Sequence, residues 1–380
     1  MARPALFFVF MCGTLAGYLT QQDWLVLFER ATPQVAAVSM TTVSSLSVEQ
    51  PDLLTHMTLE QKVGQLLMIG HWKQDYYQHT KNMLQVYGFG GVIIMSVDND
   101  LNTDVINWTR AWQSVSDIPL LISIDQEGGT VTRLQGQGFI QTSQREITSP
   151  DQAYDISVTR GRELENLGIN VNLVPVIDFA SSSDSFLYNR SFASSTQIST
   201  LSKAVMAGHT ESGVLTVPKH FPGHADTTDD SHFTLPIVDI TAAEFPAHVA
   251  QFKELLATTE VDALMKAHVQ FPKLDDQYPA TLSYEILSRQ LRRDLGFEGV
   301  IITDDMTMGA ITNQWSTNEA AVQAIQAGAD IILFAAEPNA AMAAHGYIVN
   351  AVKQGELNEE LIDQAVIRTL KLKQKQGLIR

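Results

Sequence analysis

Short apolar runs alternate along the chain with longer segments in which apolar residues recur every three or four positions. The runs are rich in valine, isoleucine and leucine and show little of the polar alternation expected of a half-exposed strand. Strands buried on both faces have this composition, which indicates a parallel sheet covered by helices. The eight strands that we predict are 66–70, 91–95, 120–124, 171–177, 214–217, 263–268, 300–303 and 331–334.

The segments between the apolar runs predict helices with recognisable ends. Thr58 and Gln61 fit a capping box at the start of the first helix of the domain. Apolar spacing predicts further helices over 283–293 and, with one buried stripe, over 358–376. Repeated strand–helix alternation favours an α/β fold, a single (β/α)₈ TIM-type barrel over residues 46–380. A doubly wound open sheet is the alternative, because periodicity alone does not show whether a sheet closes.

Residues 1–45 form a separate N-terminal region in this scheme. Arg3 and the apolar run Ala5–Tyr18 have the charged start and apolar core of a signal peptide or short anchor. The run is shorter than the ~20 residues that span a bilayer comfortably. We therefore expect a place in the cell envelope, exported or N-terminally membrane-anchored, with a cytoplasmic location as the alternative. Cys12 is the only cysteine, which excludes an intrachain disulfide and a thiolate metal site.

The composition is that of a folded globular protein and narrows the range of partners. The 380 residues are 45% hydrophobic and 18% charged, and the net charge is -17. Such a negative chain repels nucleic acid and anionic membrane surfaces, so neither is expected as the main partner. We therefore expect a small neutral substrate and a monomeric protein.

Polar side chains gather where the predicted strands end. Residues 219–232 directly follow one strand and hold three histidines, one lysine and three aspartates within fourteen positions. Packing alone does not explain such a density. Asp125, Asp178 and Asp304 follow other predicted strands. Because catalytic groups of a barrel collect at the carboxyl ends of its strands, we expect these side chains to form one site.

Asp304 and the segment Asp230-Ser231-His232 offer the two groups that cleavage of a glycosidic bond needs. Most glycosidases pair an anionic group near the anomeric carbon with a proton donor for the leaving oxygen. Asp304, at the end of an apolar strand, is suited to attack on that carbon. In an extended loop, residues two apart project to the same side, so Asp230 can bind one ring nitrogen of His232 while the other faces a substrate.

The order Lys-His-Phe-Pro-Gly-His-x-Asp-Thr-x-x-Asp-Ser-His at 219–232 resembles the signature of the family 3 glycoside hydrolases, in their β-N-acetylglucosaminidase (NagZ-like) branch. Segments 124–134 and 189–192 resemble two further parts of that family, and the likeness extends over most of 57–380. The resemblance implies a retaining exo-β-N-acetylglucosaminidase on one barrel without a second domain. It also implies a carbohydrate substrate, either cell-wall muropeptides or chitin oligosaccharides, and no metal or organic cofactor.

The same resemblance implies roles for individual residues. Asp304 corresponds to the nucleophile, His232 to the general acid/base and Asp230 to the residue that orients the histidine. The implied sugar ligands are Asp125, Arg133, Arg190, Lys219 and His220. Ala225 departs from the pattern, because a glycine is common at that position.

Other interpretations of single residues stay open. His220 and His224 could hold a metal together with Asp226 and Asp229, although proline and glycine between the histidines break the helix that this spacing normally uses. Asp304 and Asp305 could instead polarise a substrate acetamide that attacks in their place. Four more residues are expected to have only supporting roles: Glu127 on backbone donors, His224 as a loop brace, and Asp178 and His268 near or in the core.

Three alternative functions remain as well. The first is a family 3 β-glucosidase or xylosidase, which the Asp-Ser-His segment disfavours. The second is a β-N-acetylglucosaminide phosphorylase, since an uncharged histidine base would not repel a phosphate acceptor as a carboxylate would. The third is a catalytically silent carbohydrate-binding barrel.

Overall fold

The computed structural model describes residues 51–73, 76–97, 102–136, 138–224 and 227–379. The predicted signal or anchor, with Arg3, Ala5–Tyr18 and Cys12, lies outside these residues, and so do Ala225 and Asp226. Within the described part of the chain, no helix combines the length and the apolar character needed to cross a membrane.

Eight strands form one sheet in which every pair is parallel. Each strand overlaps one of the predicted runs, and the order across the sheet is β5-β4-β3-β2-β1-β8-β7-β6. The strands are β1 (Leu67–His71), β2 (Gly91–Ile94), β3 (Leu121–Ile124), β4 (Val171–Asn172), β5 (Leu215–Thr216), β6 (Ala263–Met265), β7 (Val300–Asp305) and β8 (Ile331–Phe334).

Backbone hydrogen bonds beyond the ends of β5 and β6 close this sheet into a barrel. Met265 N donates to Pro218 O over 3.0 Å, Phe221 N donates to Met265 O over 2.9 Å, and Ala267 N donates to Phe221 O over 2.7 Å. We name residues 218–221 the seam segment. The (β/α)₈ barrel is thereby confirmed, and the open-sheet alternative is wrong.

Strands β4 and β5 are shorter than the sequence predicts. The apolar runs 171–177 and 214–217 each lead to a proline, Pro175 or Pro218, which has no N–H to donate to a neighbouring strand. Pairing resumes only as an isolated parallel bridge between Val176 and Lys219. The chain therefore leaves regular strand geometry at the carboxyl end of the barrel, where its side chains become available for a site.

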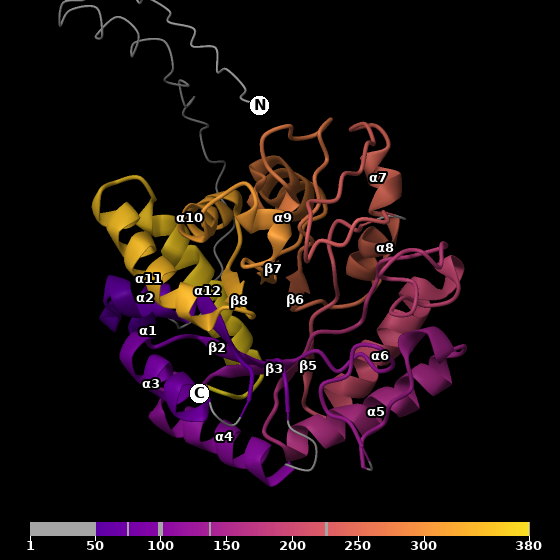
Figure 1. The fold of residues 1–380 in the computed structure, drawn as a ribbon, viewed down its shortest axis with the longest axis horizontal. Helices are drawn as coiled ribbons and strands as arrows, with labels where there is room; N and C mark the ends of the chain where they lie inside the picture. Colours follow the sequence, from indigo (N-terminus) through magenta and orange to yellow (C-terminus); the bar gives the residue numbers. More distant parts are fainter. Residues whose placement is uncertain (1–50, 74–75, 98–101, 137, 225–226, 380) are drawn as a thin grey trace, which may run out of the picture. The chain divides into compact units, whose positions relative to one another are not determined.

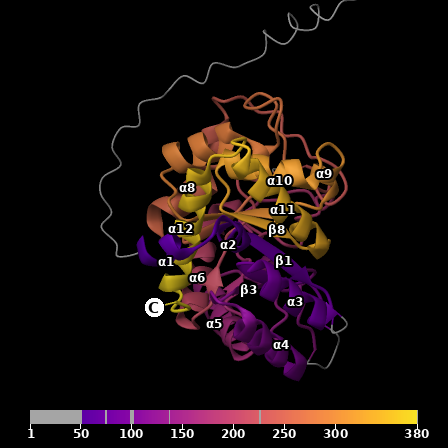
Figure 2. The same ribbon diagram turned by 90° about the vertical axis from the view of Figure 1, so that its left-hand side faces the viewer.

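Helices surround the strands (Figure 1), and the view turned by 90° shows α2 beside α11 and α12, so the first and last described parts of the chain pack together (Figure 2). The longer helices are α1 (Pro51–His56), α2 (Leu59–Gln65), α3 (Tyr77–Tyr87), α4 (Asn102–Val115), α5 (Pro150–Asn166), α6 (Ile198–Glu211), α8 (Ala250–Thr258), the π-helix η5 (Glu285–Asp294), α10 (Thr317–Ala327), α11 (Pro338–Lys353) and α12 (Glu359–Lys375). Short helices are η2 (Gln144–Glu146), η3 (Ser195–Gln197), α7 (Phe245–His248), η4 (Ala280–Leu282) and α9 (Gly309–Thr312).

The predicted helix ends are confirmed, with one difference in helix type. Thr58 and Gln61 form the capping box of α2, with bonds of 2.9 and 3.3 Å. The predicted last helix is α12, and its apolar stripe is buried as expected. The predicted helix 283–293 is the π-helix η5, whose last bond runs from Leu295 N back to Gln290 O. The spacing of apolar residues does not separate a π-helix from an α-helix.

The strands separate two hydrophobic layers. Residues such as Met68, Ile93 and Leu333 fill the interior of the barrel, whereas neighbouring positions such as Ile69 and Val92 pack toward the helices. Both faces are buried, which explains why the runs lack polar alternation. The interior layer also forms an apolar floor beneath the carboxyl ends of the strands.

Candidate active site

The polar side chains predicted from the strand ends lie together at the carboxyl end of the barrel. They line a cavity that opens to solvent and whose floor includes apolar residues such as Ile93 and Leu333. Six predicted site residues line this cavity: Asp125, Arg190, Lys219, His220, His232 and Asp304. The other two, Asp230 and Arg133, do not line it but contact His232 and Asp125 respectively.

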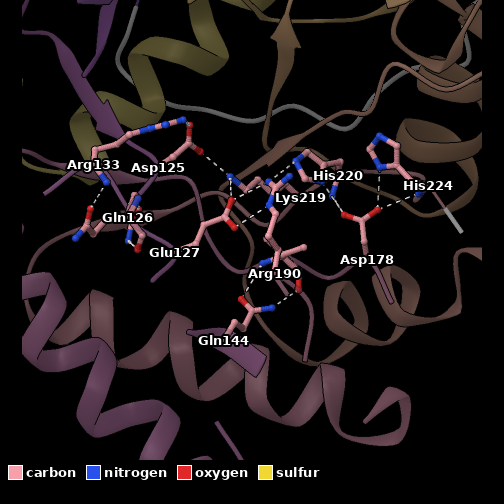
Figure 3. Close-up of polar contacts among 12 residues, drawn as sticks. Asp125, Gln126, Glu127, Arg133, Gln144, Asp178, Arg190, Lys219, His220 and His224 are labelled. Carbon is pink, nitrogen blue, oxygen red and sulfur yellow. Dashed lines mark hydrogen bonds and ion pairs between the residues drawn. The ribbon is translucent and has the colours of Figure 1, made fainter. Parts of the chain in front are cut away.

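Lys219 is buried between two carboxylates (Figure 3). Its Nζ lies 2.6 Å from Asp125 Oδ1 and 2.6 Å from Glu127 Oε1, and its side chain is only 2% exposed. A buried ammonium would destabilise the fold strongly without such partners. Because Lys219 belongs to the seam segment and its partners follow β3, these ion pairs also connect two separate parts of the barrel rim.

Arg190 binds Glu127 from the other side. Its Nε and Nη2 lie 3.0 and 2.8 Å from the two oxygens of that carboxylate, a bidentate arrangement. Burial alone would raise the pKa of Glu127, but Arg190 and Lys219 outweigh this effect and lower it to about 2. Burial of Asp125 is similarly outweighed by Lys219 and Arg133, so its pKa lies below the ordinary value. Both carboxylates are therefore charged at neutral pH.

Asp178 holds two histidines of the 219–232 segment. Its Oδ2 accepts a bond from His220 N and lies 2.7 Å from His220 Nδ1, and its Oδ1 lies 3.2 Å from His224 Nδ1. Burial lowers the pKa of His220, although Asp178 offsets part of that effect. The ring is therefore neutral at neutral pH, with Nδ1 donating to Asp178 and Nε2 as an acceptor that faces Arg190 Nη2 at 3.5 Å.

Gln126 fixes the loop that carries Arg133. Its Oε1 accepts bonds of 3.0 Å from both Arg133 N and Leu134 N. The Arg133 guanidinium then reaches Asp125, with 3.4 Å between Nη2 and Oδ2. Arg133 therefore stands at the edge of the charged network and acts on the cavity through Asp125.

Asp230 and His232 form the predicted pair on an exposed loop. His232 Nδ1 lies 2.6 Å from Asp230 Oδ1, which also accepts a bond of 2.9 Å from His232 N. The side chain of His232 is 58% exposed, and that of Asp230 is 32% exposed. Because Nδ1 donates to the carboxylate, Nε2 is the nitrogen available to a substrate.

Three hydrogen bonds attach the loop of His232 to α9. Gly309 N donates to His232 O over 2.9 Å, Ala310 N donates to Ser231 O over 3.2 Å, and Asn313 Nδ2 donates to Phe233 O over 2.8 Å. We name this set of three bonds the α9 clasp. The first turn of a helix has N–H groups without helical partners, and the loop carbonyls satisfy two of them. Since α9 follows β7 directly, the clasp connects His232 to the strand that carries Asp304.

Asp304 is half-buried at the end of β7. Its Oδ1 accepts a bond of 2.8 Å from Asp305 N. Burial would raise the pKa of Asp304, but His220 and His268 outweigh this effect, so the pKa lies below its ordinary value. Among the residues that the structure describes, no lysine or arginine lies within ion-pair distance of this carboxylate. Asp304 is thus an anionic group whose charge is available to a bound molecule.

Asp305 and His268 support the end of β7, which carries Asp304. The Asp305 carboxylate accepts bonds from Thr307 and from the backbone N–H groups of Ala335 and Ala336. His268 is fully buried, with Nδ1 2.7 Å from Thr281 Oγ1 and Nε2 3.0 Å from Asp305 O. The expected supporting role of His268 agrees with these contacts.

The expectation for Glu127 was wrong. Its carboxylate binds the side chains of Arg190 and Lys219 rather than backbone donors of its turn. Gln126 was not predicted as a site residue, although it organises the cavity wall, and Asp178, expected to have a supporting role, binds His220 and His224 there. For Gln126, the available signal was the cluster of polar residues directly after β3. For Asp178, the signal was an acidic residue that directly follows an apolar run.

A metal could in principle be held by Asp178, His220 and His224, whose ligand atoms lie within 4.8 Å of one another. Each imidazole Nδ1 already bonds to the carboxylate, however, and Arg190 Nη2 lies 3.5 Å from His220 Nε2. A cation at this point would face that guanidinium. The arrangement is better suited to holding two imidazoles by hydrogen bonds to Asp178 than to holding a metal ion. Asp229, of the ligand set considered from the sequence, is exposed.

Comparisons with known proteins agree with this geometry. The family model described as "Glycosyl hydrolase family 3 N terminal domain" matches residues 58–372. The chain is 33% identical to Beta-hexosaminidase A of Pseudoalteromonas piscicida over 326 residues, which cover 77% of this chain and 54% of that protein. It is 31% identical over 328 residues to Beta-hexosaminidase LpqI of Mycobacterium tuberculosis, with 82% of each covered.

A solved structure shares the fold. The glycoside hydrolase family 3 beta-N-acetylglucosaminidase from Paenibacillus sp. str. FPU-7 superposes with a TM-score of 0.80 at 35% sequence identity. The match covers 85% of this chain and 63% of that one. This chain therefore spans between about half and two thirds of these two longer relatives, and most of the length of the mycobacterial one.

Proposed function

Because the chain belongs to glycosyl hydrolase family 3, we propose that it is a retaining exo-β-N-acetylglucosaminidase. It would release terminal N-acetylglucosamine from cell-wall muropeptides or chitin oligosaccharides. The observation that carries the proposal is one cavity lined by both Asp304 and an accessible imidazole, His232. Within the described part of the chain, the Asp304 carboxylate forms no ion pair with a lysine or arginine. The names of the relatives support an acetamido sugar as the substrate.

In the first half of the proposed reaction, a carboxylate oxygen of Asp304 attacks the anomeric carbon. The bond from this carbon to the glycosidic oxygen breaks, and the oxygen takes a proton from Nε2 of His232. Asp230 accepts the bond from Nδ1 and so holds the ring in place. Positive charge that develops on the sugar faces the anionic Asp304, which stabilises the transition state.

In the second half, water replaces the leaving group. His232, now neutral, accepts a proton from the water while the water oxygen attacks the anomeric carbon. The ester bond to Asp304 breaks and the carboxylate is restored. Two inversions at one carbon give a product with the starting β configuration.

The buried network is proposed to hold the non-reducing sugar. Lys219 and Arg190 offer N–H donors, and Asp125 and His220 Nε2 offer acceptors, which together match the hydroxyl groups of a sugar. Opposite charges balance in the network, so a neutral ligand meets little net charge there. The balanced groups are Asp125, Glu127 and Asp178 against Arg133, Arg190 and Lys219.

Paired assays test this function. The protein is given aryl β-N-acetylglucosaminide, β-glucoside and β-xyloside, and the first-formed product is followed by NMR. Fast release of N-acetylglucosamine as the β-anomer is expected. Preference for glucoside or xyloside would replace the proposal with a β-glucosidase or xylosidase, and an α-anomer would exclude retention. If the protein cleaves none of the three substrates, the catalytically silent carbohydrate-binding barrel would be favoured.

Covalent trapping tests the nucleophile separately. A fluorinated sugar donor with a good leaving group should leave a sugar ester on the peptide that contains Asp304, detected by mass spectrometry. An active protein without this adduct would indicate that the substrate acetamide attacks instead.

A phosphorylase is the second candidate, and the Asp230–His232 pair is the observation that favours it. A neutral imidazole can deprotonate an acceptor without repelling an anionic phosphate. Sugar release at equal rates with and without added phosphate, and no sugar 1-phosphate among the products, would exclude this candidate.

We also propose a place in the cell envelope, on the basis of Arg3 and the apolar run Ala5–Tyr18. The native N-terminus from fractionated cells, read by mass spectrometry, tests this. Recovery of the whole segment in the soluble cytoplasmic fraction would overturn it.

A further inference from the structure

Phe233 has the most exposed side chain among the large apolar residues of the described chain, at 73%. Single exposed apolar residues are common and need no special reason. The position of this one is unusual, however. It is next to His232, and the two ring centroids lie 6.5 Å apart with a tilt of 54°.

The backbone of Phe233 is fixed although its ring is exposed. Its N–H donates to Asp230 O over 3.0 Å, and its carbonyl accepts the Asn313 bond of the α9 clasp. Thr234 N donates to the same Asp230 carbonyl over 3.1 Å. The aromatic ring therefore projects, next to the imidazole of His232, from a turn whose backbone is held by hydrogen bonds.

The proposed function determines what reaches this ring, and the inference rests on that function. A proton donor must lie within ~3 Å of the oxygen that it protonates. The oxygen of the leaving group would therefore lie against His232, and the exposed ring of Phe233 is within reach of the sugar that carries this oxygen. Sugar rings present apolar C–H surfaces, and aromatic side chains provide large rigid contacts for such surfaces.

We propose that Phe233 is the binding platform for the first sugar of the leaving group. The ligand class is a pyranose ring linked through its hydroxyl oxygen to the N-acetylglucosamine in the cavity. The charged network would then select the terminal sugar, and Phe233 would favour saccharides over simple alcohols as leaving groups.

The test compares two leaving groups that both need a proton. One substrate is the N-acetylglucosamine disaccharide, whose leaving group has a ring, and the other is methyl β-N-acetylglucosaminide, whose leaving group has none. Phe233→Ala should lower kcat/KM for the disaccharide about tenfold and leave the methyl glycoside within about twofold. Phe233→Trp should retain the preference, and Val86→Ala, at an equally exposed position on α3, should change neither value.

Each outcome decides between distinct explanations. Equal losses on both substrates would show that Phe233 acts only by placing His232, and no loss on the disaccharide would show that it binds nothing; both overturn the inference. If the wild-type protein prefers glucosides, the corresponding glucose disaccharide and methyl glucoside give the same comparison, so the proposed function can fail while the platform stands. If the wild type cleaves neither kind, both proposals fall. Unchanged melting temperatures verify that the variants fold.

Discussion

The two sides of the cavity are built in opposite ways. On one side, Lys219, Glu127 and Arg190 are almost completely buried and each contacts an opposite charge. On the other side, His232 is more than half exposed and its loop is attached by backbone bonds of the α9 clasp. The buried side should therefore contribute to the stability of the barrel as well as to the proposed binding of the sugar. The exposed side should contribute to chemistry with little effect on stability.

Asp304, between the two sides, should give the largest effect. Asp304→Ala removes the attacking group, so turnover should fall by about 10⁴-fold or more with every leaving group. The melting temperature should change little, because no ion pair is lost in the described structure. Steady-state rates on aryl and disaccharide substrates check this. Residual activity close to wild type would show that another group attacks.

His232→Ala should separate substrates by leaving group. Disaccharide cleavage should fall by about 10²–10⁴-fold, because the leaving oxygen must be protonated. Aryl substrates with good leaving groups need no proton in the first step and should lose far less. Similar losses on both would contradict the acid role, and a large drop in melting temperature would contradict the difference between the two sides.

Glu127→Gln should act chiefly on stability. The amide leaves Lys219 and Arg190 buried with less compensating charge, and breaking a buried pair in this way destabilises by about 3–5 kcal/mol. Urea unfolding at pH 7 measures the loss. Glu60→Gln is the control, since its partner Lys353 is exposed and the pair should matter little. Equal losses of unfolding free energy in the two variants would show that the buried network does not stabilise the fold.

The same carboxylate predicts how stability depends on pH. The pKa of Glu127 is about 2 in the folded protein against 4.5 for the free group, so its contribution is complete above pH 4.5 and is lost as the pH falls toward 2. The loss amounts to about 3 kcal/mol. The unfolding curves of wild type and Glu127→Gln should therefore approach each other over this range. Parallel curves would contradict the low pKa.

Gly309→Ala should give the smallest effect. A Cβ atom at this position would lie 2.4 Å from Phe233 O, so the α9 clasp must open. We expect cleavage of poor leaving groups to fall about tenfold through displacement of His232. Gly346→Ala, where no atom lies within 4 Å of the added group, is the matched control. Unchanged rates in both variants would show that the clasp does not position His232.

The sequence predicted the features that depend on neighbouring residues. Eight apolar runs gave the strands and their parallel arrangement, and the spacing of Asp230 and His232 gave a contact that exists. Contacts between residues far apart in the sequence could not be predicted in this way. Glu127 meets Arg190 across 63 positions and Asp178 meets His220 across 42, and no local pattern encodes these partners. Likewise, nothing local indicated that Pro218 and Phe221 close the barrel.

The seam segment has a consequence for protein engineering. Residues 218–221 complete the wall of the barrel and also contribute Lys219 and His220 to the cavity. An insertion or a new chain end placed here would disrupt the fold and the cavity lining together, so neither could be altered alone. Segment 227–234 is attached to α9 mainly by backbone bonds. It is the better place to graft a loop of different length and so exchange His232, the proposed proton donor.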